Sequence, residues 1–258
     1  MPDRNASTPQ PHVTAIYRYP IKGLSPELLT TVTLVPSATL PFDRVYAIEN
    51  GPGPFDPTAP AHLPKIHFVM LMRNEQLAAL KTTFDDATHW LTIRHGATAA
   101  AQGDLRTASG RAAIEAFIAA YMGPVLRGPA RVIAAPGHSF SDVPPKCLHI
   151  INLESLRALE TLMGLPINPL RFRPNLIFDN LPAWSEFDLV GKTLRIGPAT
   201  LEIFKRTERC AATNVDPETG ARDLKIPSFL SRSLGHADFG VYARVVEGGE
   251  VRVGDGVG

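Results

Sequence analysis

The chain contains 258 residues, and its 26 lysines and arginines nearly balance its 25 aspartates and glutamates, which gives a formal net charge of +1. A nucleic-acid-binding surface normally produces a basic excess, so this balance argues against nucleic acid as the main partner. No run reaches the ~18 uninterrupted apolar residues of a membrane span. Residues 1–10 lack the apolar segment of a secretory signal, and two cysteines give no disulfide framework, so we expect a cytoplasmic protein.

The 24 prolines of the chain disfavour long helices and favour β structure linked by loops. After a predicted flexible leader at residues 1–11, runs of β-branched and aromatic residues predict strands at residues 13–19, 31–35, 44–49 and 90–94. Residues 68–84 carry apolar side chains at helical intervals. The clearest helix is predicted at residues 109–122, with Gly123 and Pro124 ending it.

The second half repeats this mixture. Asn152 is a plausible N-cap for a helix through residue 163, and residues 224–234 are predicted to form a short helix. Strands are predicted at residues 171–178, 193–196, 200–204, 239–246 and 250–253, the last two joined as a hairpin around Gly248 and Gly249. The sequence therefore predicts an α+β fold with a dominant, barrel-like sheet, in two β-rich halves that meet near residues 124–131.

Cys210 is the first candidate for chemistry, because Arg206 and Arg209 precede it closely. Positive charge favours the thiolate, which is the nucleophilic and metal-binding form of cysteine. A lone cysteine can supply one sulfur to a metal whose other ligands arrive on a cofactor. The alternative is a small buried apolar residue, which most free cysteines are. Cys147 opens an apolar run and is predicted to lie in the core.

Basic residues form the second candidate. In a strand, Arg171, Arg173 and Asn175 would share one face and recognise an anion, since guanidinium groups match phosphate oxygens. A solvated strand face is the alternative. Lys22 follows a predicted strand in a Pro/Gly loop, where it either binds an anion or is simply solvated.

Two further segments have simpler interpretations. Arg44 has two possible acidic partners, Asp43 and Glu49, and the sequence does not choose between them. Residues 216–220 form a turn signature. The chain lacks a Gly-x-Ser-x-Gly elbow, a Walker A loop and a His-x-x-x-His pair, which argues against an α/β-hydrolase, a P-loop nucleotidase and a zinc protease.

Six segments together, in this order and spacing, resemble the MOSC family, named after the C-terminal domain of molybdenum cofactor sulfurase: residues 19–23, 43–44, 172–175, 194–197, 209–210 and 216–220. The resemblance covers nearly the whole chain. It implies a β-barrel-dominated MOSC fold preceded by a smaller β-barrel-like N-terminal module. The implied division is a leader at 1–11, the N-terminal module at 12–125 and the MOSC domain at 126–258.

The functional relatives that this resemblance suggests are the amidoxime-reducing components, which reduce N-hydroxylated compounds at a molybdenum–pterin centre. It implies a molybdenum cofactor, Mo-molybdopterin, with Cys210 as metal ligand and a small molecule as substrate. In the corresponding mechanism, Arg209 or a nearby acid would assist proton delivery. The residues that it implies for cofactor binding are Lys22, Arg44, Asn152, Ser155, Arg173, Asn175 and Arg209. Asn152 and Ser155 would act at a helix N-terminus, which favours anions.

Three departures from the family pattern qualify this picture. Gly23 stands where many relatives have serine, so one hydroxyl contact is missing. Residues 67–74 differ from the well-studied reductases, which predicts a different substrate pocket. The chain has no set of four cluster cysteines, so we expect no iron–sulfur cluster and a separate electron donor, either ferredoxin-like or a flavin reductase.

Two other functions remain open from the sequence. One is a molybdenum cofactor carrier or a sulfur-transfer protein that holds a persulfide on Cys210, because an accessible, low-pKa cysteine suits that role. The other is a ligand-binding β protein that kept the fold without the chemistry.

Overall fold

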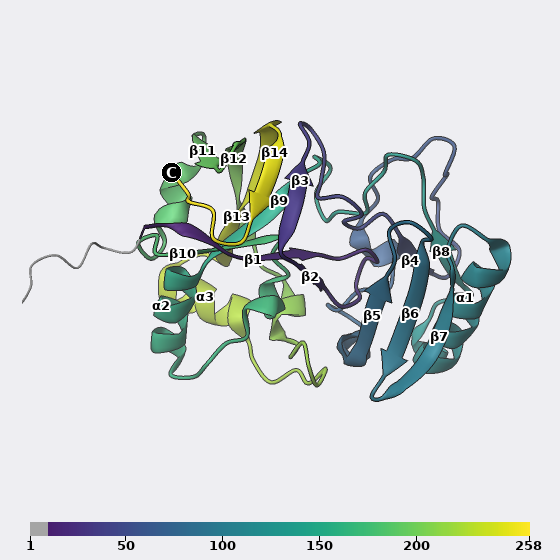
Figure 1. Cartoon of the computed structure of the whole chain (residues 1–258). Coiled ribbons are helices and arrows are strands. Elements are labelled where there is room, and N and C mark those ends of the chain that lie inside the picture. Colours follow the sequence, from purple (N-terminus) through teal and green to yellow (C-terminus); the bar gives the residue numbers. More distant parts are fainter. Residues whose placement is uncertain (1–9) are drawn as a thin grey trace, which may run out of the picture.

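A seven-stranded sheet organises one lobe of the structure, a computed structural model that describes residues 10–258 (Figure 1). The order across the sheet is β11-β12-β13-β9-β10-β1-β2. These strands are β1 (His12–Arg18), β2 (Glu27–Leu29), β9 (Leu148–Asn152), β10 (Leu176–Asp179), β11 (Thr193–Ile196), β12 (Ala199–Glu208) and β13 (Asp238–Glu247). Strands β9 and β10 are parallel and are connected through α2 (Leu153–Met163), whereas the other neighbours are antiparallel.

The two faces of this sheet bury different side chains. Helices α2 and α3 (Ile226–Leu234) pack on one face, where Leu156, Leu159 and Leu230 are buried. The other face curls into a half-barrel that includes the paired strands β3 (Thr31–Leu34) and β14 (Gly249–Arg252), with Val32 and Val251 in its core. The predicted α+β fold with a dominant, barrel-like sheet is confirmed.

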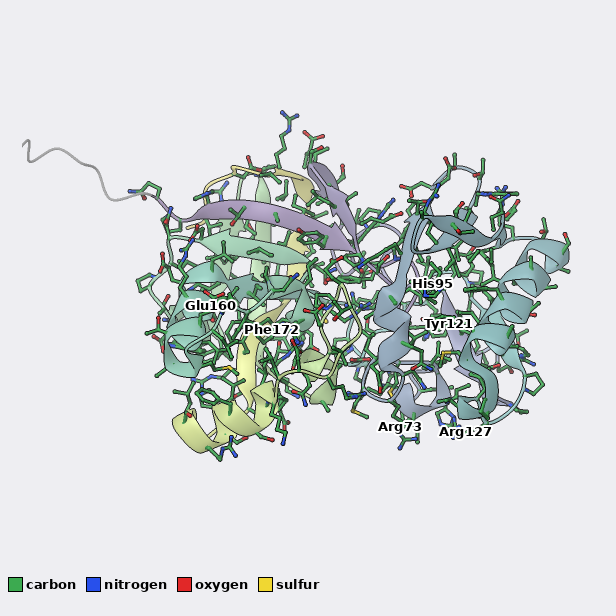
Figure 2. The ribbon with its side chains drawn as sticks, turned by 90° about the horizontal axis from the view of Figure 1, so that it is seen from below. Arg73, His95, Tyr121, Arg127, Glu160 and Phe172 are labelled. Carbon is green, nitrogen blue, oxygen red and sulfur yellow. The ribbon has the colours of Figure 1, made fainter. Side chains whose placement is uncertain are left out.

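The second lobe lies beside the first and has its own core (Figure 1). It contains the sheet β5 (Leu80–Phe84), β6 (Trp90–His95) and β7 (Thr98–Asp104), and the pair β4 (Ala47–Asn50) and β8 (Ala130–Ile133). Helix α1 (Ala108–Met122) covers this lobe, with Ile114 and Ile118 buried beneath it. The ring centroids of Tyr121 on α1 and His95 on β6 lie 5.2 Å apart (Figure 2).

Several sequence predictions hold because a local signal determines the element. Helix α1 ends at Met122 with Gly123 as its C-cap, and α3 begins within two residues of its predicted start. The side chain of Asn152 accepts a hydrogen bond from the backbone N–H of Glu154, so it is the N-cap of α2. The predicted turn at residues 216–220 is confirmed, with the Asp216 carboxylate accepting from the backbone N–H groups of Glu218 and Thr219.

Three predictions are wrong. Residues 68–84 contain a short 3₁₀ helix (Glu75–Ala79) and strand β5, in which alternate residues are buried. Residues 171–178 begin as a 3₁₀ helix (Pro169–Phe172), and the strand starts only at Leu176, because Pro174 interrupts the segment. Strand β14 pairs with β3 and does not form a hairpin with β13, so Gly248 connects strands of different sheets and Gly249 begins β14.

The division of the chain into modules at residues 125 and 126 stays a prediction. Strands β1 and β2 precede that boundary, and they pair within the same sheet as β9 to β13, which follow it. The predicted leader lies almost wholly in residues 1–9, outside the described residues. Among residues 10–258, no helix has the length and apolar composition that crossing a membrane requires.

Candidate functional site

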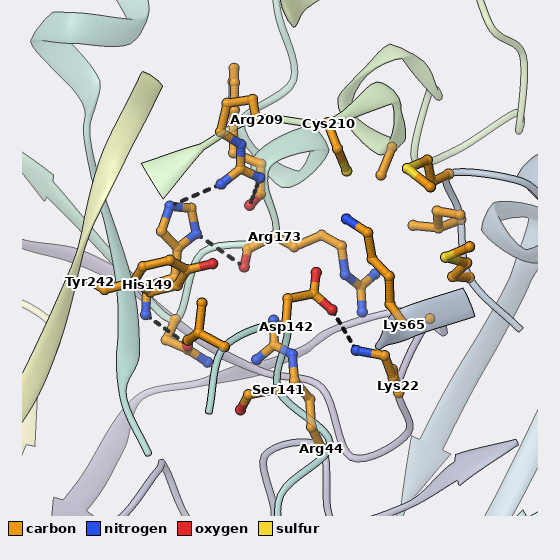
Figure 3. A pocket seen from close by; sticks show the side chains of 18 of the residues that line it. Lys22, Arg44, Lys65, Ser141, Asp142, His149, Arg173, Arg209, Cys210 and Tyr242 are labelled. Carbon is orange, nitrogen blue, oxygen red and sulfur yellow. Dashed lines mark hydrogen bonds and ion pairs between the residues drawn. The ribbon is translucent and has the colours of Figure 1, made fainter. Parts of the chain in front are cut away.

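A pocket opens where several chain segments that are distant in sequence converge (Figure 3). The space within it, including the open mouth, is about 820 Å³, which suits a small molecule. We call it the basic pocket, because its lining combines six cationic residues with one carboxylate, Asp142: Lys22, Arg44, Lys65, Arg171, Arg173 and Arg209. Cys210 also lines it.

Lys22 enters the basic pocket from the turn that follows β1. Its side chain is almost fully buried, and its Nζ donates to the carbonyl oxygen of Phe140 at 2.8 Å and to the carboxylate of Asp142. Burial lowers the pKa of Lys22, and the neighbouring Asp142 opposes that shift. For Asp142, burial acts to raise the pKa, but attraction to Lys22 and Lys65 outweighs burial and holds that pKa well below its usual range. The carboxylate is therefore ionised at neutral pH.

Arg44 and Arg173 are both stacked on the ring of Tyr19. Their guanidinium carbons lie 4.7 and 4.1 Å from the ring centroid, and the tyrosine has no exposed surface. Both arginines have left-handed backbone conformations, with φ of 55° and 53°. Such conformations cost free energy in residues other than glycine and concentrate at functional sites.

The two arginines differ in their remaining partners. Arg44 pairs with Asp43, which outweighs the effect of burial and raises the pKa of Arg44. Arg173 donates through Nη1 to the carbonyl oxygen of Leu24 at 2.8 Å, while its buried Nη2 has no partner. Burial lowers the pKa of Arg173 to about 10, so it remains cationic at neutral pH. An unpartnered, buried guanidinium nitrogen is costly and indicates room for an anion.

Arg209 directly precedes Cys210 at the end of β12, and two contacts fix its guanidinium. Its Nη2 donates to the carbonyl oxygen of Phe172 at 2.7 Å, and its Nη1 lies 3.2 Å from Nε2 of His149. Burial, followed by the charge of Arg209, lowers the pKa of His149 well below its ordinary value. The ring is therefore neutral, with Nε2 accepting from Arg209 and Nδ1 facing the carbonyl oxygen of Arg173 at 3.4 Å.

The two cysteines that line the pocket differ in environment. Cys210 is partly exposed and begins a short 3₁₀ helix (Ala211–Asn214), whereas Cys147 is buried as predicted. Burial raises the pKa of the Cys147 thiol to about 12, so it stays neutral. Among the described residues, no three His, Cys, Asp or Glu side chains converge as metal ligands. A metal held by Cys210 would therefore take its other ligands from a cofactor.

Six of the eight predicted site residues line this one pocket: Lys22, Arg44, Arg173, Asn175, Arg209 and Cys210. Within this set, the amide of Asn175 is engaged with the backbone: it accepts from the N–H of His149 at 3.0 Å and donates to the carbonyl oxygen of Tyr17 at 3.1 Å. It thereby joins β9 to β1 beneath the pocket. Arg171, predicted to share a strand face with Arg173, instead pairs with Asp216 and Asp223.

The other two, Asn152 and Ser155, do not line the pocket. Both are fully buried at the start of α2 and donate to the same oxygen of Glu186, at 3.2 and 2.7 Å. Burial raises the pKa of Glu186, and these donors oppose that shift. The sequence predicts an anion site at this helix N-terminus, but the side-chain donors of Asn152 and Ser155 already bind the carboxylate of Glu186.

Sequence reasoning missed four residues of the basic pocket: Lys65, Asp142, His149 and Tyr242. The sequence does contain an indication of His149, because this residue interrupts the apolar run that forms the central strand β9. Asp142 lies in an irregular segment and Lys65 begins a three-residue 3₁₀ helix (Lys65–His67), and in neither does periodicity or a motif indicate which way the side chain points.

Comparisons with known proteins agree with this geometry. Residues 10–121 match the MOSC N-terminal beta barrel domain, and residues 137–258 match the MOSC domain. The chain is 32% identical over 127 residues to mitochondrial amidoxime reducing component 2 of Rattus norvegicus, covering 44% of this chain and 37% of that protein. It is 28% identical over 131 residues to mitochondrial amidoxime-reducing component 1 of Homo sapiens, covering 46% and 38%.

The alignments thus span little more than a third of the length of these curated relatives. Among solved structures, the YUAD protein of Bacillus subtilis aligns over 96% of this chain and 94% of its own, with a TM-score of 0.45 and 12% identity. The two domain matches together include residues of both lobes and every residue that lines the basic pocket. The chain belongs to the MOSC family.

Proposed function

We propose that this protein binds a molybdenum cofactor and reduces N-hydroxylated small molecules. The observation that carries the proposal is the convergence of Cys210 with the cationic side chains of Lys22, Arg44, Arg173 and Arg209 in one pocket. A pterin cofactor of this kind combines a phosphate with a soft metal. The cations of the pocket suit the phosphate, and the thiol of Cys210 suits the metal.

The residues present fit such a group. The buried, unpartnered Nη2 of Arg173 provides a donor for a phosphate oxygen, and Lys22 can exchange Asp142 for the same anion. Gly23 has φ of 85°, and a Cβ there would lie 2.9 Å from the carbonyl oxygen of Val69. A serine at this position would be strained by the backbone conformation and would crowd that carbonyl oxygen, so the backbone favours glycine.

Each part of the chain has a defined task in this proposal. Lys22, Arg44 and Arg173 hold the phosphate end, and the Cys210 thiolate holds the metal. Arg209, kept in place by His149 and Phe172, places a positive charge beside that sulfur and assists proton delivery. When bound, the cofactor supplies the electrons and the Lewis acidity.

For an amidoxime the overall change is balanced by two electrons and two protons: the N–O bond breaks, an amidine forms and water leaves. We propose that the electrons come from a separate donor protein, either ferredoxin-like or a flavin reductase. Both cysteines are free thiols. We propose the cytoplasm as the location, where free thiols persist.

The test is the molybdenum and pterin content of the protein, purified from a host that makes the cofactor, beside Cys210→Ala and Cys147→Ala. Stoichiometric molybdenum and pterin are expected in the wild type and in Cys147→Ala. Cys210→Ala is expected to lose the metal or all activity. Turnover of an aromatic amidoxime with a chemical reductant completes the test, and turnover that survives complete removal of molybdenum would refute the proposal.

The sulfur-transfer alternative predicts a different result. Mass spectrometry would then find a persulfide on Cys210 in protein that contains no pterin.

A further inference from the structure

One side of the basic pocket is apolar. Met70, Leu71 and Met72 line it, together with Ala212, which follows Cys210 closely in the chain. In Figure 3, Cys210 lies at the opposite end of the pocket from Lys22 and Asp142. A substrate that reaches Cys210 therefore meets thioether and aliphatic surface as well as Arg209, whereas Lys22 and Arg44 lie at the other end of the pocket.

Arg222 fastens this apolar wall to the segment that carries Cys210. Its Nη2 donates to the carbonyl oxygens of Leu71 and Met72, at 3.1 and 2.7 Å, and its Nη1 donates to the carbonyl oxygen of Ala211 at 3.1 Å. The same guanidinium pairs with Glu75 at 3.0 Å. One side chain thus spans the two sides of the pocket beside Cys210.

Neighbouring contacts hold Arg222 in this position. A Cβ on Gly220 would lie 3.0 Å from the carbonyl oxygen of Glu75, so the turn before Arg222 packs directly against residues 70–75, which we call the wall segment. Lys81 donates to the carbonyl oxygen of Pro217 at 2.8 Å. On the inner side, Arg171 binds both Asp216 and Asp223. The loop that bears Arg222 is therefore anchored at both ends.

We infer that Arg222 is a positioning residue that sets the width of the pocket beside Cys210, and so selects N-hydroxylated substrates with narrow, apolar bodies. This inference rests on the proposed function for the identity of the substrate. The positioning role of Arg222 does not depend on that function, because it consists of the hydrogen bonds from Arg222 to the carbonyl oxygens of Leu71, Met72 and Ala211. Without Arg222, the carbonyl oxygens of Leu71 and Met72 lose their shared donor, and the wall can move away from Cys210.

The experiment compares Arg222→Ala with the wild type and with Arg206→Ala. Arg206 is a matched control, because it is exposed and stacks on Phe187 outside the pocket. Arg222→Lys is the conservative variant, whose single ammonium group cannot reach all three carbonyl oxygens and should give an intermediate result. Arg222 is itself exposed, so its replacement leaves the cores intact.

The first measurement is limited trypsin digestion of the full chain, followed by mass spectrometry. Arg73 is exposed within the wall segment, and Figure 2 shows it at the rim of the molecule. Cleavage after Arg73 is expected to become about tenfold faster in Arg222→Ala, the size of effect that losing charged hydrogen bonds produces. It should be unchanged in Arg206→Ala. An unchanged cleavage rate in Arg222→Ala would show that Arg222 does not hold this segment in place, and would overturn the inference.

The second measurement is the ratio of kcat/KM for a bulky and a small aromatic amidoxime with the molybdenum-loaded enzyme. Arg222→Ala is expected to raise that ratio about tenfold through KM, with kcat for the small substrate within about twofold of the wild type. An unchanged ratio overturns the inference.

If the wild type reduces no amidoxime, the proposed function fails, and pocket width is then measured by alkylation of the free Cys210 thiol. The rate with a bulky maleimide, relative to iodoacetamide, must rise in Arg222→Ala. If it does not, the inference fails as well.

Discussion

At the scale of single residues, the contact of two arginines with the ring of Tyr19 is central to the basic pocket. Like charges repel, yet Arg44 and Arg173 are both held on one aromatic ring, each in a strained backbone conformation. The electron-rich face of the ring attracts both cations. The pocket therefore presents two fixed guanidinium groups before any anion arrives, which reduces the cost of ordering them on binding.

Replacing Tyr19 with leucine should separate this positioning role from simple core packing. We expect Tyr19→Leu to weaken the binding of inorganic phosphate about tenfold, since each cation–π contact contributes roughly 0.5–2 kcal/mol. Tyr19→Phe keeps the ring and removes only a buried hydroxyl that has no partner, so its affinity should match the wild type. Calorimetric titration of cofactor-free protein measures both, and equal affinities for Tyr19→Leu and Tyr19→Phe would contradict this role.

Asp142 occupies a position that an anionic ligand would compete for. Its carboxylate accepts from Lys22, and Lys65 and Arg44 also attract it. Removing its charge in Asp142→Asn is expected to strengthen phosphate binding about tenfold, because the cations lose their internal counter-ion. Asp85→Asn, at an exposed turn, is the control. Weaker binding in Asp142→Asn would mean that the carboxylate orders the cations and does not compete with phosphate.

The residues of the pocket were only partly predictable from sequence. Arg209 and Cys210 are adjacent in the chain, so their proximity is evident without a structure. Asp142 reaches Lys22 across 120 residues, and that pairing depends on how two irregular segments pack. Asn152 and Ser155 show the opposite error: a correct local prediction of a helix N-terminus gave the wrong partner, since Glu186 is distant in sequence and supplies the acceptor.

At the scale of secondary-structure elements, local signals predicted those elements whose ends are marked by capping or turn residues. Helix α1 is an example, with Thr107 capping its start and Gly123 ending it. Residues 68–84 were misassigned because their apolar spacing also fits a 3₁₀ turn followed by a strand. Pairing between β14 and β3 joins distant segments, and no local pattern indicates it.

The start of α2 provides a test of the two roles assigned to Asn152. Asn152→Ala removes the N-cap and one donor to the buried Glu186, so the free energy of unfolding should fall by about 1–3 kcal/mol. Urea denaturation measures this loss. Phosphate affinity should stay at the wild-type value, because the side chain lies outside the basic pocket. A tenfold loss of affinity without loss of stability would restore the cofactor-binding role that the sequence suggested.

At the scale of the whole molecule, the two halves of the sequence are interleaved. Strands β1 and β2 extend the sheet formed by β9 to β13, and β3 pairs with β14. The basic pocket draws Lys22 and Arg44 from the first half and Arg173 and Cys210 from the second. Neither half contains a complete pocket.

A fragment of residues 126–258 should therefore fail to fold as an independent domain, although the MOSC domain match begins at residue 137. It would leave the edge of β10 unpaired and expose the half-barrel core that β1 and β3 cover. We expect aggregation, or a far-ultraviolet circular dichroism spectrum without cooperative thermal unfolding. A soluble fragment with a sharp transition would show that the sheet tolerates the loss of its N-terminal strands.

The pairing of β1 with β10 also has a consequence for synthesis of the chain. Thr14 and Ile177, which are in contact through a hydrogen bond, are 163 residues apart. At roughly 5–20 residues per second, β1 waits about 10–30 s on the ribosome before its neighbour emerges. During that interval its edge is open to other chains or to chaperones. The pocket needs both Lys22 and Tyr242, so an anionic ligand can meet a complete pocket only after the segment that carries Tyr242 has emerged.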